Sequence, residues 1–132
     1  EIDESDAAVD IPVACRYREL DERYPGSRFI LTTRPFEEWI DRRRRKPADR
    51  GRPHKWVLDT RIRMYGSITF DVKLYTEAYY RHHEEVNDYF KERLEDLLIL
   101  PLKADDKWER LCSFLGKEIP FVEYPWEKIK ST

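Results

Sequence analysis

Arg34 is the residue of this sequence best suited to hold an anion. It follows FILTT, a β-prone run of buried-strand type, and Pro35 suits the first turn of a following helix. A helix N-terminus offers unpaired N–H groups and a positive dipole end, while a guanidinium offers a planar fork of donors. Together these groups suit a phosphate. The spacing fits equally well with Arg34 pairing with a carboxylate, for example Asp10.

Four consecutive arginines, Arg42 to Arg45, close the same segment. On a helix they point to all sides, so they cannot all face one ligand. Such a run is usually a solvated helix end, where cations also complement the dipole. Arg42 lies two turns after Arg34 and could share an anion with it. We expect the other three to remain in water or to screen a charged substrate.

Asp10 is a second candidate for chemistry, because it closes the apolar run AAV at an expected strand end. A carboxylate beside arginines could act as a general base. The competing interpretation is an ion pair or a cap for the next helix, and the residues alone favour that one.

The sequence HHEE, His82 to Glu85, raises the question of a metal site. Helical spacing places His82 and Glu85 on one face but supplies no third ligand. His82 also falls on an apolar stripe, so we expect a hydrogen-bonded core histidine and no metal. The sequence contains no GxSxG, CxxC or GxGxxG motif, and no GxxxxGK[ST] phosphate loop.

Composition predicts a single globular domain over residues 1–132, with 40% hydrophobic residues and a net charge of only -2. Charge is concentrated locally, since residues 34–63 hold 11 Lys/Arg against 5 Asp/Glu. We therefore expect an anionic partner at one place, without specific nucleic-acid or membrane binding. No apolar run approaches the roughly 20 residues that cross a bilayer. Cys15 and Cys112 fall in helix-like patterns, which favours reduced thiols and a cytoplasmic location.

Hydrophobic periodicity predicts strands that alternate with helices, and hence an α/β domain with a parallel sheet flanked by helices. The expected strands are residues 7–11, 28–33 and 96–102. The expected helices are residues 13–24, one that starts at Pro35, 58–64, 71–94 capped by Asp71, and 106–115 closed by Gly116. Three short strands are few for a parallel sheet, so the domain looks incomplete at its N-terminus.

Several motifs in order resemble the sulfotransferases. They are DIPVACRYRELDERYPGSRFILTTRPFEEWIDR, then YYRHHEEVNDYFKERLEDLLILPL, then KWERLCSFLGKEIPFVEYP, and they span nearly the whole chain. The resemblance implies a P-loop-NTPase-like fold that binds 3'-phosphoadenosine 5'-phosphosulfate (PAPS). It also implies transfer of the sulfuryl group to a hydroxyl or amine of a small-molecule or glycan acceptor.

The resemblance also assigns roles to single residues. Arg34 matches the arginine that holds the 3'-phosphate of PAPS, and Arg42 occupies the position where the family normally has a second phosphate contact, a serine. Asp10, in DIP, falls where many cytosolic members carry the catalytic histidine. His82 matches a recurrent family histidine without an assigned part in catalysis.

One family feature is missing, namely the strand and lysine- and glycine-rich loop that wraps the 5'-phosphosulfate. We therefore expect the C-terminal part of a sulfotransferase domain, with transfer impaired unless that loop is supplied. The alternative is a non-catalytic module on the same fold that binds a polyanion such as a sulfated glycan or RNA. A nucleotide kinase is a weaker option, because no lid and no magnesium-binding carboxylate motif is recognisable.

Overall fold

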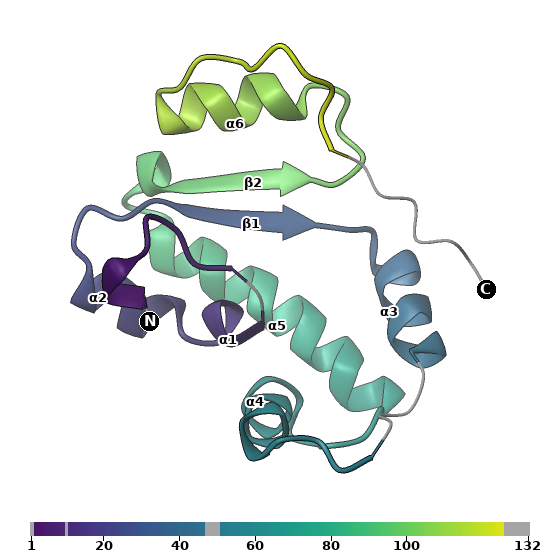
Figure 1. Ribbon diagram of the computed structural model, residues 1–132. Coiled ribbons are helices and arrows are strands. Elements are labelled where there is room, and N and C mark those ends of the chain that lie inside the picture. The colour runs from purple at the N-terminus through teal and green to yellow at the C-terminus, as the bar shows by residue number, and fades with distance from the viewer. Residues whose placement is uncertain (1, 10, 47–50, 126–132) are drawn as a thin grey trace.

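The computed structural model describes residues 2–9, 11–46 and 51–125. In chain order its elements are η1 (Ile2–Glu4), α1 (Ile11–Ala14), α2 (Tyr17–Arg23), β1 (Phe29–Thr33), α3 (Phe36–Arg45), α4 (Lys55–Tyr65), α5 (Val72–Phe90), η2 (Leu94–Asp96), β2 (Leu97–Pro101) and α6 (Lys107–Leu115). Figure 1 shows the two strands side by side, with α5 beneath β1 and α6 above β2. None of the helices in the described ranges is both long enough and apolar enough to cross a membrane.

The sheet consists, over the described residues, of β1 and β2 in parallel, in register from Phe29 beside Leu97 to Thr33 beside Pro101. The connection between the strands runs through α3, α4 and α5, as parallel strands require. This confirms the predicted parallel sheet flanked by helices and the second and third expected strands. The P-loop-NTPase-like arrangement stays a prediction.

The strand expected at residues 7–11 is wrong. Residues 7–9 have no regular structure, and Ile11 begins the short helix α1. Val9 is 83% exposed, so the apolar run AAV does not enter the core. Pro12 lies in the first turn of α1, where a missing N–H costs nothing. The helix predicted over residues 13–24 is likewise divided, with α2 starting only at Tyr17.

Helix α5 is the longest element and is fixed at its start by the predicted cap. Asp71 accepts a hydrogen bond from the Leu74 N–H through Oδ1 at 2.9 Å. The helix buries one stripe, made of Tyr75, Ala78, Val86 and Phe90. It ends at Phe90, four residues before the predicted end. The predicted helix end at Gly116 is confirmed, since this glycine closes α6 with a left-handed φ of 65°.

Two hydrophobic clusters lie along this stripe. Near the start of α5, Tyr75 and Ala78 pack with Ile40 of α3 and Tyr65 of α4. The Tyr65 and Tyr75 rings stack with centroids 3.9 Å apart. Near the end of α5, Val86 and Phe90 pack with Tyr17 of α2, and the second cluster also takes in partly buried Phe29, Leu31, Tyr89 and Leu97. One helix therefore joins α3 and α4 to α2 and the sheet.

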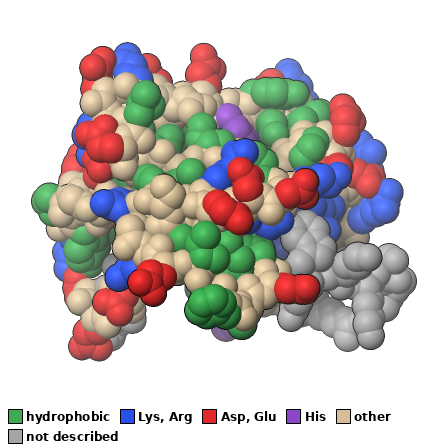
Figure 2. All heavy atoms as spheres, turned by 90° about the horizontal axis from the view of Figure 1, so that it is seen from above, with side chains coloured by type: hydrophobic (Ala, Val, Ile, Leu, Met, Phe, Trp, Pro, Cys, Tyr) green, Lys and Arg blue, Asp and Glu red, His purple; other side chains and the backbone are tan. Residues whose placement is uncertain are grey.

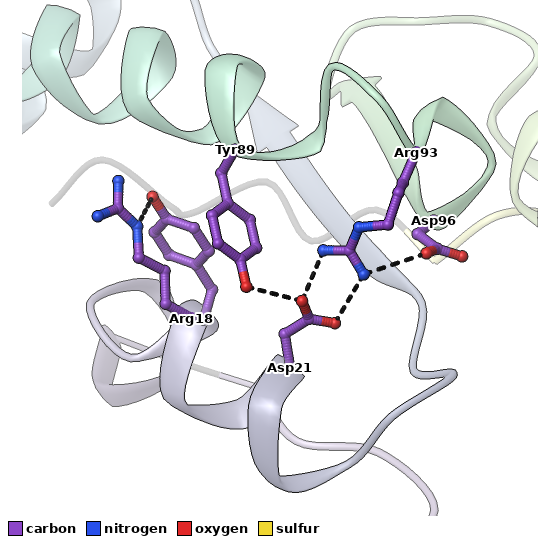
Figure 3. A network of polar contacts seen from close by, with 6 residues as sticks. Arg18, Asp21, Tyr89, Arg93 and Asp96 are labelled. Atoms are coloured by element: carbon purple, nitrogen blue, oxygen red, sulfur yellow. Dashed lines mark hydrogen bonds and ion pairs between the residues drawn. The ribbon is translucent and has the colours of Figure 1, made fainter.

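A buried carboxylate ties α2 to the end of α5 (Figure 3). Asp21, only 9% exposed, accepts hydrogen bonds from Arg93 at 3.2 Å and 2.5 Å and from the Tyr89 hydroxyl at 2.7 Å. Arg93 also reaches Asp96 of η2 at 3.4 Å. The bonds from Arg93, and then that from Tyr89, hold the pKa of Asp21 below its ordinary value although burial opposes them. Asp21 is therefore ionised and fully paired at neutral pH.

Replacing Asp21 by asparagine is expected to lower the free energy of unfolding at neutral pH by about 2 kcal/mol, because Arg93 loses its buried anionic partner. The pKa of Asp21 is lower in the folded than in the unfolded chain, so its contribution is complete above the ordinary value of 3.8 and fades as the pH falls through the folded-state pKa. Urea denaturation at neutral pH and near pH 3 measures both effects.

Asp88→Asn is the matched control, because Asp88 also pairs with a cation, Lys91, but its side chain is 72% exposed. We expect little change in stability from this variant at either pH. Equal losses in the two variants would show that burial of Asp21 has no special role.

Candidate functional site

Arg34 lies at the junction that sequence analysis selected, between the end of β1 and the start of α3. Its backbone is held from a distant part of the chain, because the Tyr79 hydroxyl of α5 donates to the Arg34 carbonyl at 2.6 Å. Burial raises the pKa of Tyr79, so this hydroxyl keeps the proton that it donates. The turn that carries Arg34 is thus anchored to the central helix.

Aromatic packing places Tyr79 for this role. Its ring lies 5.3 Å from that of Phe36 and 5.1 Å from that of Trp39, both on α3. On its own helix it lies 4.3 Å from the ring of His83. Rings at these distances contribute beyond their buried area and fix one another's orientation. The start of α3 and the middle of α5 therefore form one packed unit around the Arg34 turn.

The Arg34 side chain is 25% exposed and faces Glu38, one turn into α3, at 3.9 Å. That distance is too long for a hydrogen bond, so the guanidinium keeps its donors. Glu38 pairs more closely with Lys103, which follows β2. A carboxylate partner for Arg34 was one of the two expectations. The structure identifies it as Glu38, whereas Asp10, the example considered, lies outside the described residues.

Lys103 is a part of the site that the sequence analysis missed. The rule that selected Arg34, a cation just beyond the carboxyl end of a parallel strand, applies to Lys103 as well. The two strand ends are level, because Thr33 pairs with Pro101 and the Leu102 N–H donates to the Thr33 carbonyl at 2.9 Å. Two cations thus share one carboxylate at this edge of the sheet.

The backbone at the start of α3 adds to the positive character of this edge. Pro35 is the N-cap residue and supplies no side-chain cap, and the Trp39 N–H donates to the Pro35 carbonyl at 3.0 Å. The N–H groups before Trp39 belong to the first turn, which has no intrahelical acceptor. An anion beside Arg34 would meet both side-chain and backbone donors.

The arginine run divides differently from the expectation that Arg43, Arg44 and Arg45 all remain in water, because two of them contact other side chains. Arg43 lies over the Trp39 ring at 5.5 Å, and Arg45 pairs with Asp41 at 2.6 Å. Arg42 and Arg44 are exposed and form no hydrogen bond or ion pair with the rest of the described chain. On the side of the molecule where α3 lies, Figure 2 shows basic side chains interspersed with acidic ones. No contact joins Arg42 to Arg34.

The two central histidines of α5 differ in their bonding. His83, and not His82 as predicted, forms a hydrogen bond, from Nδ1 to the Tyr79 carbonyl at 2.7 Å. Its Nε2 is buried without a partner among the described residues. Burial lowers the pKa of the partly buried His82, and the neighbouring His83 adds to this effect. Within the described ranges no group of three His, Cys, Asp or Glu residues could hold a metal ion, and both cysteines are free thiols.

Comparison with known proteins gives one family. The family described as "Sulfotransferase domain" matches residues 2–132. Searches of curated proteins and of solved structures found no match for the chain.

Tyr79→Phe is expected to lower the free energy of unfolding by about 1 kcal/mol, because the Arg34 carbonyl loses its hydrogen bond from α5. The ring and its packing remain, so the loss of stability measures the contribution of the hydrogen bond from the Tyr79 hydroxyl to the Arg34 carbonyl. Urea denaturation followed by circular dichroism gives the value.

Tyr80→Phe serves as the control, since Tyr80 is the next residue on the same helix and is 55% exposed. We expect its stability to match that of the unchanged chain. A Tyr79→Phe variant as stable as Tyr80→Phe would contradict a role for the hydroxyl in holding the turn.

Proposed function

Because the chain belongs to the sulfotransferase domain family, we propose that it transfers a sulfuryl group from PAPS to a hydroxyl or amine acceptor. In such a transfer the acceptor oxygen or nitrogen attacks sulfur, the bond from sulfur to the 5'-phosphate oxygen breaks, and the acceptor proton passes to a base. The products are the sulfated acceptor and adenosine 3',5'-bisphosphate. The observation that supports this proposal best is the position of Arg34.

Arg34 has the properties that a 3'-phosphate site needs. It lies at the carboxyl end of a parallel strand and at the start of a helix, where α/β folds bind phosphates. Its pair with Glu38 is long, at 3.9 Å, so a phosphate oxygen would find donors free. Lys103 pairs with the other carboxylate oxygen of Glu38 and would add a second positive charge. The same features support the P-loop-NTPase-like arrangement, which we propose with the function.

Two further assignments depend mainly on the family resemblance. We assign Arg42 as an additional phosphate contact, and its exposed side chain without a partner in the described chain is compatible with that role. We assign Asp10 as the base that accepts the acceptor's proton. Asp10 lies outside the described residues, so this assignment rests on its place in the DIP motif alone.

Arg34→Gln is expected to weaken binding of adenosine 3',5'-bisphosphate about tenfold or more, because it removes a charge-assisted bidentate contact. Arg42→Gln should weaken binding less, since an exposed charge is screened by solvent and salt. Isothermal titration calorimetry with the whole chain measures both affinities.

Arg44→Gln is the matched control, because it removes the same charge from an exposed position of α3. We expect its affinity to stay within about twofold of the unchanged chain. Equal affinities in Arg34→Gln and Arg44→Gln would remove Arg34 from the binding site.

A polyanion-binding module is the alternative function, and the exposed, unpaired side chains of Arg42 and Arg44 are what favours it. Against it, Arg43 and Arg45 are engaged with Trp39 and Asp41. Only half of the run is therefore free to contact successive phosphates or sulfates of a polymer.

On our proposal the chain binds a single-stranded RNA of about 20 nucleotides no more tightly than about 100 μM at physiological salt, the weak end of non-specific binding. Fluorescence anisotropy at several salt concentrations tests this. Tight binding that weakens steeply with salt and is lost in the Arg42→Gln, Arg44→Gln double variant would favour the polyanion-binding module.

A further inference from the structure

A hollow of about 420 Å³ lies beside the middle of α5. Its walls come from the α1–α2 region, the last turn of α4 and the middle of α5, which Figure 1 shows close together below the sheet. Ala78, Arg81 and His82 of α5 face it, whereas the intervening Tyr79 binds the Arg34 carbonyl. Neighbouring faces of α5 therefore contact two different sites, the Arg34 turn and the hollow.

The rim of this hollow is rich in guanidinium groups. Arg16 and Arg18 come from α2 and the residue before it, Arg63 from α4 and Arg81 from α5. Glu19 and Glu85 are the only carboxylates among the described lining residues, which leaves an excess of two positive charges. The chain as a whole has a net charge of -2, so this local excess of positive charge would attract an anion to the hollow.

The bonds already formed leave many donors unused. Arg16 donates through Nη1 to Glu19 at 3.1 Å, and Arg63 donates through Nη2 to the other oxygen of Glu19. Arg81 donates through Nη2 to the Met64 carbonyl at 3.2 Å. Each guanidinium carries five N–H donors, and the contacts above use only one donor of each of these arginines. Glu19 alone cannot satisfy two arginines.

The inner wall is of a different character. Tyr17, Met64 and Ala78 give it an apolar surface, and Tyr17 and Ala78 are buried. His82 lies on this wall with its ring 6.1 Å from that of Tyr17, and its lowered pKa makes it a neutral group at physiological pH. A neutral imidazole offers an acceptor as well as a donor. The volume is at the lower end of the range that holds small ligands.

We propose that this hollow is a binding site for a small organic acid, whose carboxylate meets Arg63 and Arg81 and whose apolar body lies against Tyr17 and Ala78. With the proposed function, on which this role rests, such a ligand would be the acceptor and would carry its reacting hydroxyl or amine in addition to the carboxylate. The binding site itself rests only on the hollow, its charge and its walls.

Benzoate and its neutral isostere benzamide are the probes, added separately to the isotope-labelled whole chain and followed by NMR. We expect benzoate to shift amide signals of residues 15–19 and 78–85 and to bind about tenfold more tightly than benzamide, the value of one charge-assisted hydrogen bond. Equal affinity for the two probes, or benzoate shifts centred on Arg34, would overturn the proposal.

Arg63→Gln is expected to reduce the affinity for benzoate to that for benzamide. Arg81→Gln gives a second test that leaves the Arg63–Glu19 ion pair intact. Arg110→Gln, which removes an arginine paired with Asp106 on the distant helix α6, should leave benzoate binding unchanged. If both hollow variants bind benzoate like Arg110→Gln does, the arginines do not form the site.

Titration with adenosine 3',5'-bisphosphate separates this inference from the proposed function. We expect the nucleotide to leave bound benzoate in place and to bind Arg63→Gln as it binds the unchanged chain. Competition between the two ligands would overturn a separate site. A chain that binds benzoate selectively but no nucleotide would contradict the proposed function and leave the organic-acid site standing.

Discussion

The whole structure depends on the apolar stripe of helix α5. Two parallel strands of five residues cannot bury enough surface to be stable alone, so they need a helix packed across them. Helix α5 supplies it, with Val86 and Phe90 facing Phe29, Leu31 and Leu97 in the second cluster. In the N-terminal half of α5, Tyr75 and Ala78 of the same stripe pack against α3 and α4. The Arg34 turn and helices α2, α3 and α4 are all in contact with this helix.

Two tyrosine hydroxyls on α5 hold polar groups of neighbouring segments. The Tyr79 hydroxyl donates to the Arg34 carbonyl and so holds the Arg34 turn, and the hydroxyl of Tyr89, near the other end of the helix, donates to Asp21. In both cases a ring that belongs to the core carries a hydroxyl at its edge, and tyrosine is suited to this division. These two hydrogen bonds fix the backbone at Arg34 and the buried carboxylate of Asp21. The result is a basic strand edge on one side of α5 and a basic hollow on another.

Much of this could be predicted from the sequence, where local patterns are strong. FILTT, the Asp71 cap and the Gly116 stop act through neighbouring residues, and each was found where expected. The strand predicted for AAVDI was wrong because burial depends on tertiary packing, and Val9 is left exposed. The position of Arg34 was predictable, and its partner Glu38 lies at a local i,i+4 spacing that could have been read from the sequence. Lys103 was not selected, since its place beside them depends on which strands are adjacent. The hollow was not foreseen, because its walls combine residues of α1 and α2 with residues of α4 and α5, which lie more than forty positions later in the sequence.

The placement of both clusters on one helix also has a consequence for unfolding. If they lay on separate elements, each half of the molecule could melt by itself. Here the loss of either cluster frees one end of α5, which can then unwind. The shortened helix would be too short to stay folded and to support the other cluster. The described chain should therefore lose its structure in a single cooperative transition, and local damage at one end would be felt at the other.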